Sequence, residues 1–380
     1  MSRVVYLDYN AGAPARPEVV VAVAGALAEA GNPSSIHGPG RAARQRIETA
    51  RAQVAALVGA APEGVVFTSG GTEANAQILA GSGRARVIVS AVEHPSVLDA
   101  VPTAERITVD GDGVIDLAAL ERLLAADRRP ALVSVMLANN ETGVIQPVAE
   151  AAAIARAHGA LFHSDVAQAV GRIPVSLAAL GADFLSVSAH KMGGPAGVGA
   201  LVMADGAFTV APILLGGGQE RRRRAGTENL CGIAGFGVAA TLAGDELHDG
   251  DTISAPGRLR DRLERQALEL VPEAVVIAAG AARLPNTCCL ALPGVASQTQ
   301  VMALDLAGVA VSAGAACSSG KVAESRVLAA MGLDPVLRGS AIRVSLGWAS
   351  RAEDVDVFLA AWAGLARRKG FKVSGAVAAA

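Results

Sequence analysis

Apolar segments and helical segments alternate along the first part of the chain, and the apolar segments end in polar loops. Clear examples are residues 65–68, 87–90 and 132–137, which lead into loops of glycine, histidine or asparagine. A continuous apolar run is typical of a strand that is buried on both faces of a sheet. Strands that alternate with helices form a parallel sheet covered by helices. We therefore predict an α/β fold whose polar loops meet at one edge of the sheet.

Length, charge and hydropathy exclude several classes of protein. A chain of 380 residues is long enough for more than one domain. The net charge of -2 argues against a broad nucleic-acid footprint, because the dense basic cluster is confined to the arginines at 221–224. The apolar runs are shorter than the span of about 20 residues that crosses a membrane, and residues 1–8 lack the pattern of a signal peptide. We expect a cytoplasmic protein that binds neither nucleic acid nor membrane.

A second, smaller domain is expected in the C-terminal part. Residues 244–257 contain Gly, Asp and Pro and are typical of a passage between domains. The pattern beyond them is α+β, with short strands near 275–277 and 288–292. Cys288 and Cys289 fall in the second of these strands, so we expect them in the core. The cysteines show no spacing typical of a metal site, and no metal is expected.

Lys191 stands at the end of a predicted strand, which is an unusual place for a lysine. Residues 182–188 alternate apolar and small polar side chains, and residues 193–195 end the strand. Partial burial disfavours the ammonium form and lowers the pKa of the amine. Such an amine suits a Schiff base with an aldehyde such as pyridoxal 5'-phosphate (PLP). The alternative is a solvated lysine beside a glycine turn, which is the commoner case for a single lysine.

Gly71 and Thr72 follow the strand at 65–68 and begin a helix. Backbone N–H groups and the positive end of the helix dipole converge at such a place, which suits a phosphate. An ordinary capped connection between strand and helix is the alternative. Ser188 and His190, close to the lysine in sequence, could supply further donors to the same phosphate.

Polar residues end two other strands. His94 follows the strand at 87–90 and could act as an acid–base group or stack on an aromatic cofactor ring. Asp165 follows the strand at 160–163, where a carboxylate could keep the pyridine nitrogen of PLP protonated. Gln168 could donate to the phenolic oxygen of the same ring. Each residue alone has a plain explanation as a hydrogen-bonded loop residue, but together they form a cofactor constellation.

Three further residues are candidates for handling a substrate. Asn32 could orient a carboxylate, although Asn before Pro is more often part of a turn. Arg343 lies in an alternating strand and could hold a carboxylate with its guanidinium fork, with a solvated strand arginine as the alternative. Cys317 lies in a run of small residues that suits an accessible nucleophile, with a buried small residue as the alternative.

In their order, these segments resemble the NifS/IscS-type cysteine desulfurases, PLP enzymes of fold type I in the class-V aminotransferase family. The likeness runs almost from end to end and rests on these segments: 6–10, 31–35, 67–73, 93–94, 139–143, Asp165 with Gln168, 188–191, 216–229, 317–320 and Arg343. The resemblance implies a large PLP-binding domain at 13–250 with a mostly parallel seven-stranded sheet flanked by helices. It also implies a small α+β domain at 1–12 and 251–380 that carries the cysteine loop.

The resemblance also assigns roles to residues. It implies that Lys191 holds PLP, that Asp165 pairs with the pyridine nitrogen, and that His94 stacks on the ring and moves protons. Gln168 would bond the ring oxygen. The full cofactor-binding set is Gly71, Thr72, His94, Asn140, Asp165, Gln168, Ser188, His190, Lys191 and Thr227. Thr227 would reach across from the partner subunit of a homodimer, while Asn32 and Arg343 would take the substrate carboxylate.

The activity that the resemblance implies is the desulfuration of L-cysteine. The implied catalytic residues are Cys317, Lys191 and His94. L-Cysteine would displace Lys191, and the Cys317 thiolate would attack the substrate sulfur. Alanine would leave, and the persulfide on Cys317 would pass to an acceptor protein such as an iron–sulfur scaffold.

The sequence departs from the family pattern at three places and leaves rival functions open. The departures are Ala11 to Ala13, Ala196, and residues 313–316, each of which removes polar groups near the site or its loop. Another PLP enzyme of the same fold, a selenocysteine lyase or an aminotransferase, is the alternative within the enzyme class. A sulfur carrier or scaffold without turnover is the alternative outside it, and DNA binding by the arginines at 221–224 is the weakest.

Overall fold

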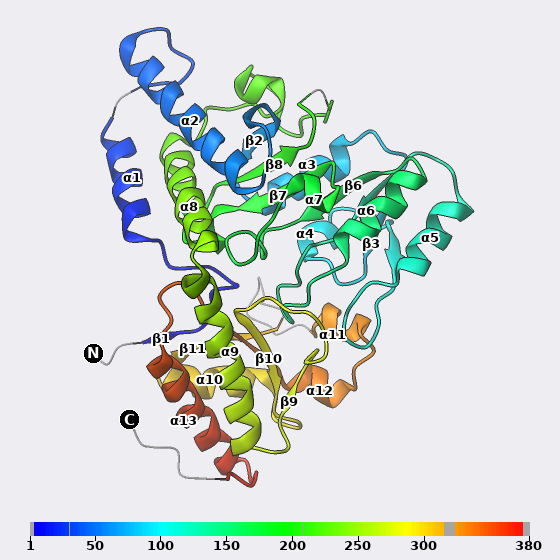
Figure 1. Cartoon of the computed structure of the whole chain (residues 1–380), viewed down its shortest axis with the longest axis vertical. Coiled ribbons are helices and arrows are strands. Elements are labelled where there is room, and N and C mark those ends of the chain that lie inside the picture. Colours follow the sequence, from blue (N-terminus) through cyan, green and yellow to red (C-terminus); the bar gives the residue numbers. More distant parts are fainter. Residues whose placement is uncertain (1–3, 30, 207, 315–323, 375–380) are drawn as a thin grey trace.

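The computed structural model describes residues 4–29, 31–206, 208–314 and 324–374. Figure 1 shows an upper part built on a large sheet and a lower part built on a smaller one. Helix α8 (Leu230–His248) runs through the upper part, and α9 (Gly250–Leu270) continues into the lower part. The passage at 244–257 therefore consists of two helices that meet at Asp249, and the second begins earlier than the sequence pattern indicated.

The large sheet has seven strands and is mostly parallel, as predicted. Its order is β2 (Val65–Thr68), β8 (Gly199–Met203), β7 (Phe184–Ser188), β6 (Leu161–Asp165), β5 (Ala131–Ser134), β3 (Arg86–Ser90) and β4 (Glu105–Ile107). Only β8 runs antiparallel to its neighbours in this sheet. Strands β2, β3, β5, β6 and β7 therefore end at the same edge, which is where an α/β sheet binds ligands.

Helices cover both faces of this sheet because successive strand residues point in opposite directions. In β2, Val65 and Phe67 join the core on one face, while Val66 joins the core on the other. The first face is covered by α2 (Gly38–Leu57), α5 (Leu117–Ala126), α6 (Val148–Ala157), α7 (Leu177–Leu180) and α8. The second is covered by α3 (Gly71–Gly81) and α4 (Pro95–Leu98).

Helix α8 packs between α2 and α1 (Pro17–Ala28). Of the described residues, only α8 forms a helix long and apolar enough to cross a membrane, and 50% of that stretch is buried inside the protein. Its glycines allow the close packing. A Cβ at Gly237 would come within 2.7 Å of the Cα of Ala50 in α2.

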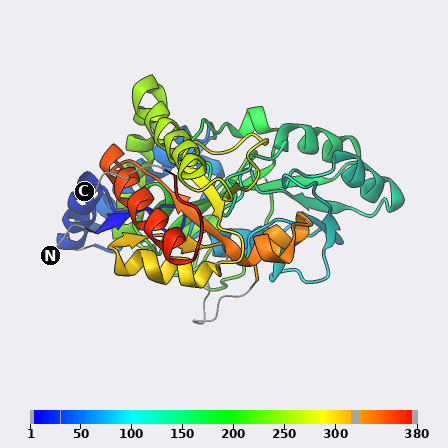
Figure 2. The same cartoon turned by 90° about the horizontal axis from the view of Figure 1, so that it is seen from below.

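The lower part combines an antiparallel sheet with three long helices. The sheet has the order β12 (Ser312–Ala313), β13 (Ala341–Ser345), β10 (Thr287–Ala291) and β9 (Val275–Val276). Seen from below in Figure 2, it lies among α9, α10 (Ser297–Leu306) and α13 (Ala352–Arg368). Cys288 and Cys289 are buried on β10, as predicted, and Trp362 is fully buried in the core. Helices α11 (Arg326–Ala330) and α12 (Pro335–Ser340) complete this part.

The N-terminal strand joins the C-terminal part of the chain. Strand β1 (Val5–Tyr6) pairs in parallel with β11 (Val309–Ala310), and Asp8 bridges to Ser345 at the end of β13. This pairing supports our proposal that residues 1–12 and 251–380 form one domain and residues 13–250 the other. Residues 10–11 then pass directly over the ligand-binding edge of the large sheet.

Candidate active site

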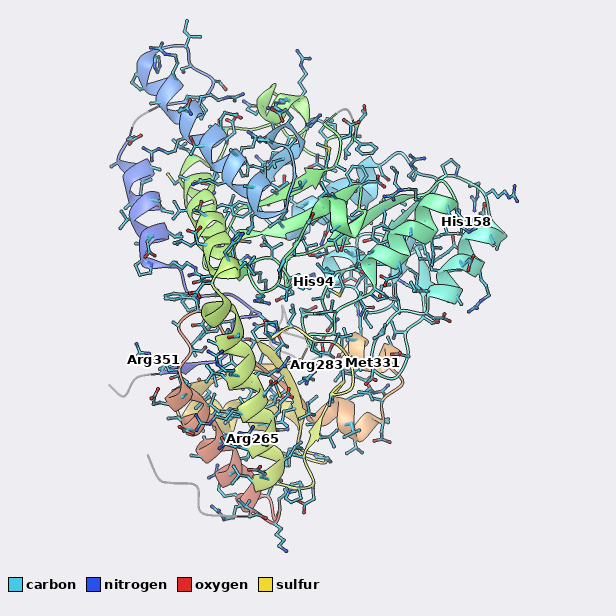
Figure 3. All side chains as sticks on the ribbon, in the orientation of Figure 1. His94, His158, Arg265, Arg283, Met331 and Arg351 are labelled. Carbon is cyan, nitrogen blue, oxygen red and sulfur yellow. The ribbon has the colours of Figure 1, made fainter. Side chains whose placement is uncertain are left out.

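A pocket of about 310 Å³ lies at the predicted edge of the large sheet. This volume is that of a small-molecule site. The large part contributes Gly71, Thr72, Asn75, His94, Pro95, Ser96, Met136, Asn140, Glu141, Asp165, Ala167, Gln168, Ser188, His190 and Lys191, and Asn10, Ala11 and Arg343 complete the lining. Figure 3 shows His94 at the junction between the upper and lower parts.

Lys191 ends a short 3-10 turn (Ala189–Lys191) directly after β7. Its Nζ donates to the backbone carbonyl of Asn10 at 2.5 Å and to that of Ala11 at 2.9 Å. The lysine is thus held from the N-terminal loop by carbonyl groups, which any residue type supplies. The departure from the family pattern at residues 11–13 leaves these contacts in place.

The environment of Lys191 favours its neutral amine. Burial lowers the pKa of Lys191 from 10.5 to about 8, and the guanidinium groups of Arg172 and Arg343 act in the same direction. The carboxylates of Asp8 and Asp165 act in the opposite direction and are the weaker influence. A large neutral fraction at mildly alkaline pH is the state that a nucleophilic lysine requires.

Asp165 and Gln168 follow β6, beside the lysine. Asp165 is 7% exposed; its Oδ1 accepts from the backbone N–H of Ala167 at 2.9 Å, and its Oδ2 accepts from Asn75 Nδ2 at 2.8 Å. Arg172 donates to Gln168 Oε1, which turns the Gln168 amide NH₂ towards Asn10 O at 3.0 Å. Gln168 therefore presents a donor rather than an acceptor to the pocket.

His94 caps the N-terminus of α4 and faces the same pocket. Its Nδ1 accepts from the Ser96 backbone N–H at 3.1 Å and lies 2.8 Å from Ser96 Oγ. Burial lowers the pKa of His94, the nearby Lys191 acts in the same direction, and Asp165 opposes both. The imidazole is thus neutral near pH 7, with its proton on Nε2.

A set of anion-binding groups meets at one end of the pocket. Gly71 and Thr72 are the first residues of α3, whose initial N–H groups have no partner within the helix. A Cβ at Gly71 would lie 3.6 Å from the Cβ of Ser188, so the two segments adjoin. Ser188 Oγ lies 2.8 Å from His190 Nδ1. Burial, with the positive charges of Lys191 and Arg172, lowers the pKa of His190 to about 4 and keeps it neutral.

Arg343 reaches the pocket from β13 and is 2% exposed, which excludes the alternative of a solvated strand arginine. Its Nη2 donates to Asp8 Oδ1 at 2.7 Å and its Nη1 to the Asn140 carbonyl at 2.9 Å. Within the described residues its Nε has no partner. A buried guanidinium that lines a pocket suits a carboxylate ligand.

Two predicted residues of the described part of the chain are not brought into this pocket. Asn32 is exposed, and its Oδ1 accepts from the Ser34 backbone N–H at 2.9 Å, which is the turn geometry that its sequence also allowed. Thr227 is exposed and lines a separate cavity with Phe67 and Arg224. Cys317 lies outside the described residues.

The arginines at 221–224 form a packed turn and not a free arm. Arg224 Nε lies 2.9 Å from Glu73 Oε1, and Arg223 donates to the carbonyl of Glu63 at 3.0 Å. Glu220, Arg221 and Arg222 have left-handed φ angles of 45°, 55° and 65°. Such a run is costly and needs support from its surroundings. Buried Arg51 supplies it, with Nη1 and Nη2 each 2.8 Å from the Glu220 carboxylate.

Five pocket neighbours were missed from the sequence: Asn10, Asn75, Ser96, Glu141 and Arg172. Asn75 stands one turn after Thr72 on α3, so helical spacing could have indicated it. Glu141 was noted only as part of a motif, yet Ser325 Oγ donates to its Oε2 at 2.6 Å and burial raises its pKa. Glu141 and Ser325 are 184 positions apart in the chain, and no local sequence pattern reveals such a contact.

An α/β sheet with an amine of lowered pKa at one strand end and a clamped carboxylate at the next defines a cofactor-dependent type of enzyme site. Residues 5–358 match the family Aminotransferase class-V, and the chain belongs to this family. A cysteine desulfurase of Cereibacter sphaeroides is 44% identical over 93% of this chain and 94% of the relative. A NifS-like protein from Rickettsia africae has a structure with a TM-score of 0.89 and 36% identity, over 96% of this chain and 100% of that one. A structure of SspA in complex with cysteine has a TM-score of 0.76 and 26% identity, over 90% of this chain and 98% of that one.

Proposed function

We propose that this chain is a PLP-dependent cysteine desulfurase that converts L-cysteine to L-alanine and retains the sulfur as a persulfide. The observation that carries the proposal is the position of the Lys191 amine, with a pKa of about 8, in one pocket with Asp165, Gln168 and His94. The relatives that are named cysteine desulfurases support the same activity.

The residues of the pocket fit PLP. Ser188, His190, Gly71 and Thr72 would hold the phosphate, and the Gln168 amide would donate to the ring oxygen. When bound, PLP would supply a protonated pyridine ring that takes up electrons from the substrate. The negative charge of the Asp165 carboxylate would keep the ring nitrogen protonated. N–H donors to both of its oxygens hold this carboxylate in place.

Each remaining pocket residue has a task that its geometry allows. Arg343 would bind the substrate carboxylate with its guanidinium, which lines the pocket, with Asn140 beside it. His94 would exchange protons at Nε2, because its Nδ1 is committed to Ser96. Asn32 lies outside the pocket of its own subunit, and its role in carboxylate binding stays a prediction.

Cys317 is the proposed sulfur acceptor within the chain. The described residues on either side of its segment lie beside Glu141 of the pocket: Ser325 donates to Glu141 Oε2, and a Cβ at Gly314 would be 2.6 Å from the same oxygen. The Cys317 thiolate would attack the sulfur of L-cysteine. A sulfur–sulfur bond would form as the carbon–sulfur bond breaks, and the electron pair left on carbon would be protonated to give alanine.

A homodimer would complete the phosphate site. Thr227 faces a different cavity of its own chain, so we propose that it serves the pocket of the partner subunit. Apolar side chains on the surface support a subunit interface: Val21 and Leu27 of α1 are 72% and 74% exposed, and Ile36 and Leu215 are 91% and 84% exposed. The persulfide would then pass to a separate acceptor protein, such as an iron–sulfur scaffold, in the cytoplasm.

The experiment that tests the proposal measures alanine released from L-cysteine by PLP-loaded protein in the presence of a thiol reductant. We expect turnover by the wild type and a loss of turnover in Cys317→Ala, because no thiol then accepts the sulfur. Equal alanine from both proteins would contradict the proposal. Transamination by the Cys317→Ala variant would favour the aminotransferase alternative.

A further inference from the structure

Asn75 lies between two parts of the pocket to which the proposed function gives separate tasks. It stands one turn into α3 and is fully buried. Its Nδ2 donates to Asp165 Oδ2 at 2.8 Å and to Ser96 Oγ at 2.9 Å. A single amide group thus contacts both the carboxylate and the serine that holds His94.

The hydrogen bond from Asn75 to Asp165 fixes the carboxylate in one orientation. Asp165 Oδ1 is held by the Ala167 backbone N–H, and Asn75 holds the other oxygen. If the Asn75 amide were turned around, its Oδ1 would face Asp165 Oδ2, and two acceptors would meet without a proton. The observed orientation therefore matches an ionised carboxylate.

Ser96 fixes the tautomer of His94 through its backbone N–H and contacts the same ring nitrogen through its hydroxyl. A backbone N–H can only donate, so the Ser96 N–H leaves His94 Nδ1 without a proton. Ser96 Oγ accepts from Asn75 and lies 2.8 Å from His94 Nδ1, to which it can donate its own proton. The Ser96 N–H thus places the imidazole proton on Nε2, which is the atom free to meet a ligand, and the hydrogen bonds that run from Asn75 through Ser96 Oγ hold the ring in that position.

Packing alone does not explain an amide at this position. Asn75 Oδ1 is buried and has no partner among the described residues. An unsatisfied buried acceptor reduces stability, and an apolar side chain of similar size would avoid that cost. The two contacts of Nδ2 are therefore the physical contribution of this side chain.

We propose that Asn75 is a positioning residue that sets the orientation of Asp165 and, through the Ser96 hydroxyl, supports the position of the His94 ring. This inference rests on the proposed function, because the two groups act on the same bound cofactor and substrate. Asn75 itself need not touch the reacting atoms. Substitution can separate the hydrogen bond of Asn75 to Asp165 from its hydrogen bond to Ser96, since Ser96 contacts His94 and does not contact Asp165.

The test compares Asn75→Leu, Ser96→Ala and a control in PLP-loaded protein, by the pH dependence of the cofactor absorption band and by the kinetics of alanine release. Asn75→Leu should move the apparent pKa of the band and lower kcat about ten- to a hundredfold, with KM within about threefold of wild type. Ser96→Ala should leave the band and its pH dependence unchanged but lower kcat and move the pH profile of kcat.

Gln300→Leu is the matched control. Gln300 is also a fully buried amide with two backbone acceptors, Val295 O at 2.9 Å and Ser340 O at 2.6 Å, but it lies in the core of the lower part. Its loss should reduce the melting temperature without moving the cofactor band. This control therefore distinguishes the effect of lost stability from the effect of lost positioning of Asp165 and His94.

Two results would overturn the inference. One is an Asn75→Leu protein whose band and kcat stay within about twofold of wild type across the pH range. The other is a Ser96→Ala protein whose band moves as far as that of Asn75→Leu, because the effects on Asp165 and on His94 would then not be separate. A wild-type protein that takes up no PLP overturns the proposed function and this inference with it, so the two failures are distinguishable.

Discussion

The floor of the pocket and its rim are built in different ways. The floor consists of Asp165, Lys191 and Asn75, which come from neighbouring strands and a helix of the large sheet and hydrogen-bond to groups of the same chain. The rim consists of Arg343, which comes from the small sheet, and in the proposed homodimer it also includes the turn at 219–229 of the partner subunit. In its own chain, this turn lines a separate cavity. One sheet edge thus carries the floor residues, with Lys191 also held by the carbonyls of Asn10 and Ala11 in the N-terminal loop. The rim residues come from outside this edge.

This difference has a consequence for what each region can do. The floor is fixed by strand ends whose backbone is held on both sides by neighbouring strands. The rim has groups that lack a protein partner or face solvent: the buried Nε of Arg343 has no partner among the described residues, and Thr227 is exposed. A rigid floor suits a bound cofactor, and an open rim suits groups that come and go, such as a substrate and a partner subunit.

The largest effect is expected from the support of the turn at 219–229. Arg51→Met removes the partner of buried Glu220 and leaves a charge without compensation beside three left-handed residues. We expect a loss of about 3–5 kcal/mol in the free energy of unfolding, measured by urea denaturation. The cofactor band should stay unchanged, because Arg51 does not line the floor.

A second substitution sharpens this result. Arg51→Met combined with Glu220→Met replaces the ion pair by apolar side chains and should recover much of the lost stability. If the single and double variants were equally unstable, the isolated charge of Glu220 would not be the cause. If the single variant also altered the cofactor band, floor and rim would not be independent.

Sequence patterns found most of the floor but little of what supports it. Lys191, Asp165 and His94 were predicted because each follows an apolar strand, and parallel strands bring their ends together. The seven-stranded sheet was predicted through the family resemblance and is confirmed. Asn75 was missed because its importance depends on which face of α3 meets β6, a fact of tertiary packing.

The rim was less predictable for physical reasons. At Asn32 the local turn prevailed, because a short side chain next to its own backbone reaches Ser34 before any distant ligand. Arg343 was predicted, but its pairing with Asp8 joins positions 335 residues apart. Thr227 depends on a second subunit in our proposal, and a single sequence does not show which surfaces meet.

A smaller effect is expected from the fork of Arg343. Arg343→Lys keeps a positive charge near Asp8 but lacks the planar N–H groups that can meet a carboxylate and the Asn140 carbonyl together. We expect KM for L-cysteine to rise about ten- to a hundredfold with a small change in kcat, the scale of one hydrogen bond to a charged group. Steady-state kinetics of alanine release measure both constants.

Arg283→Lys is the control for this substitution. Arg283 also belongs to the lower part and forms two bonds to Glu264, at 2.6 Å and 2.8 Å, but it does not line the pocket. Its KM should equal that of the wild type. A rise in KM for both variants would mean that the lower part is disturbed in general, and no rise for Arg343→Lys would remove it from carboxylate binding.

The smallest effect concerns the charge of the floor lysine in the absence of PLP. Because burial and Arg172 lower the pKa of Lys191 to about 8, its neutral fraction reaches one half near that pH and levels off about one pH unit higher. An ordinary exposed lysine continues to gain reactivity up to a pH of about 10.4. We expect acetylation of Lys191 by acetic anhydride, followed by mass spectrometry, to be half-maximal near pH 8 and to reach a plateau about one pH unit higher, with exposed Lys369 as the internal reference.

Arg172 separates the two causes of this lowered pKa. Arg172→Leu removes a positive charge, which favours the ammonium form, so the plateau should move to higher pH, whereas Arg172→Lys keeps the charge and should move it less. An unchanged plateau in Arg172→Leu would leave burial and the charge of Arg343 as the causes. A Lys191 reactivity that still rose steadily beyond pH 9 in the wild type would show that the floor does not lower the pKa of the amine. The proposed contrast between a floor that is preorganised for the cofactor and an open rim would then be wrong.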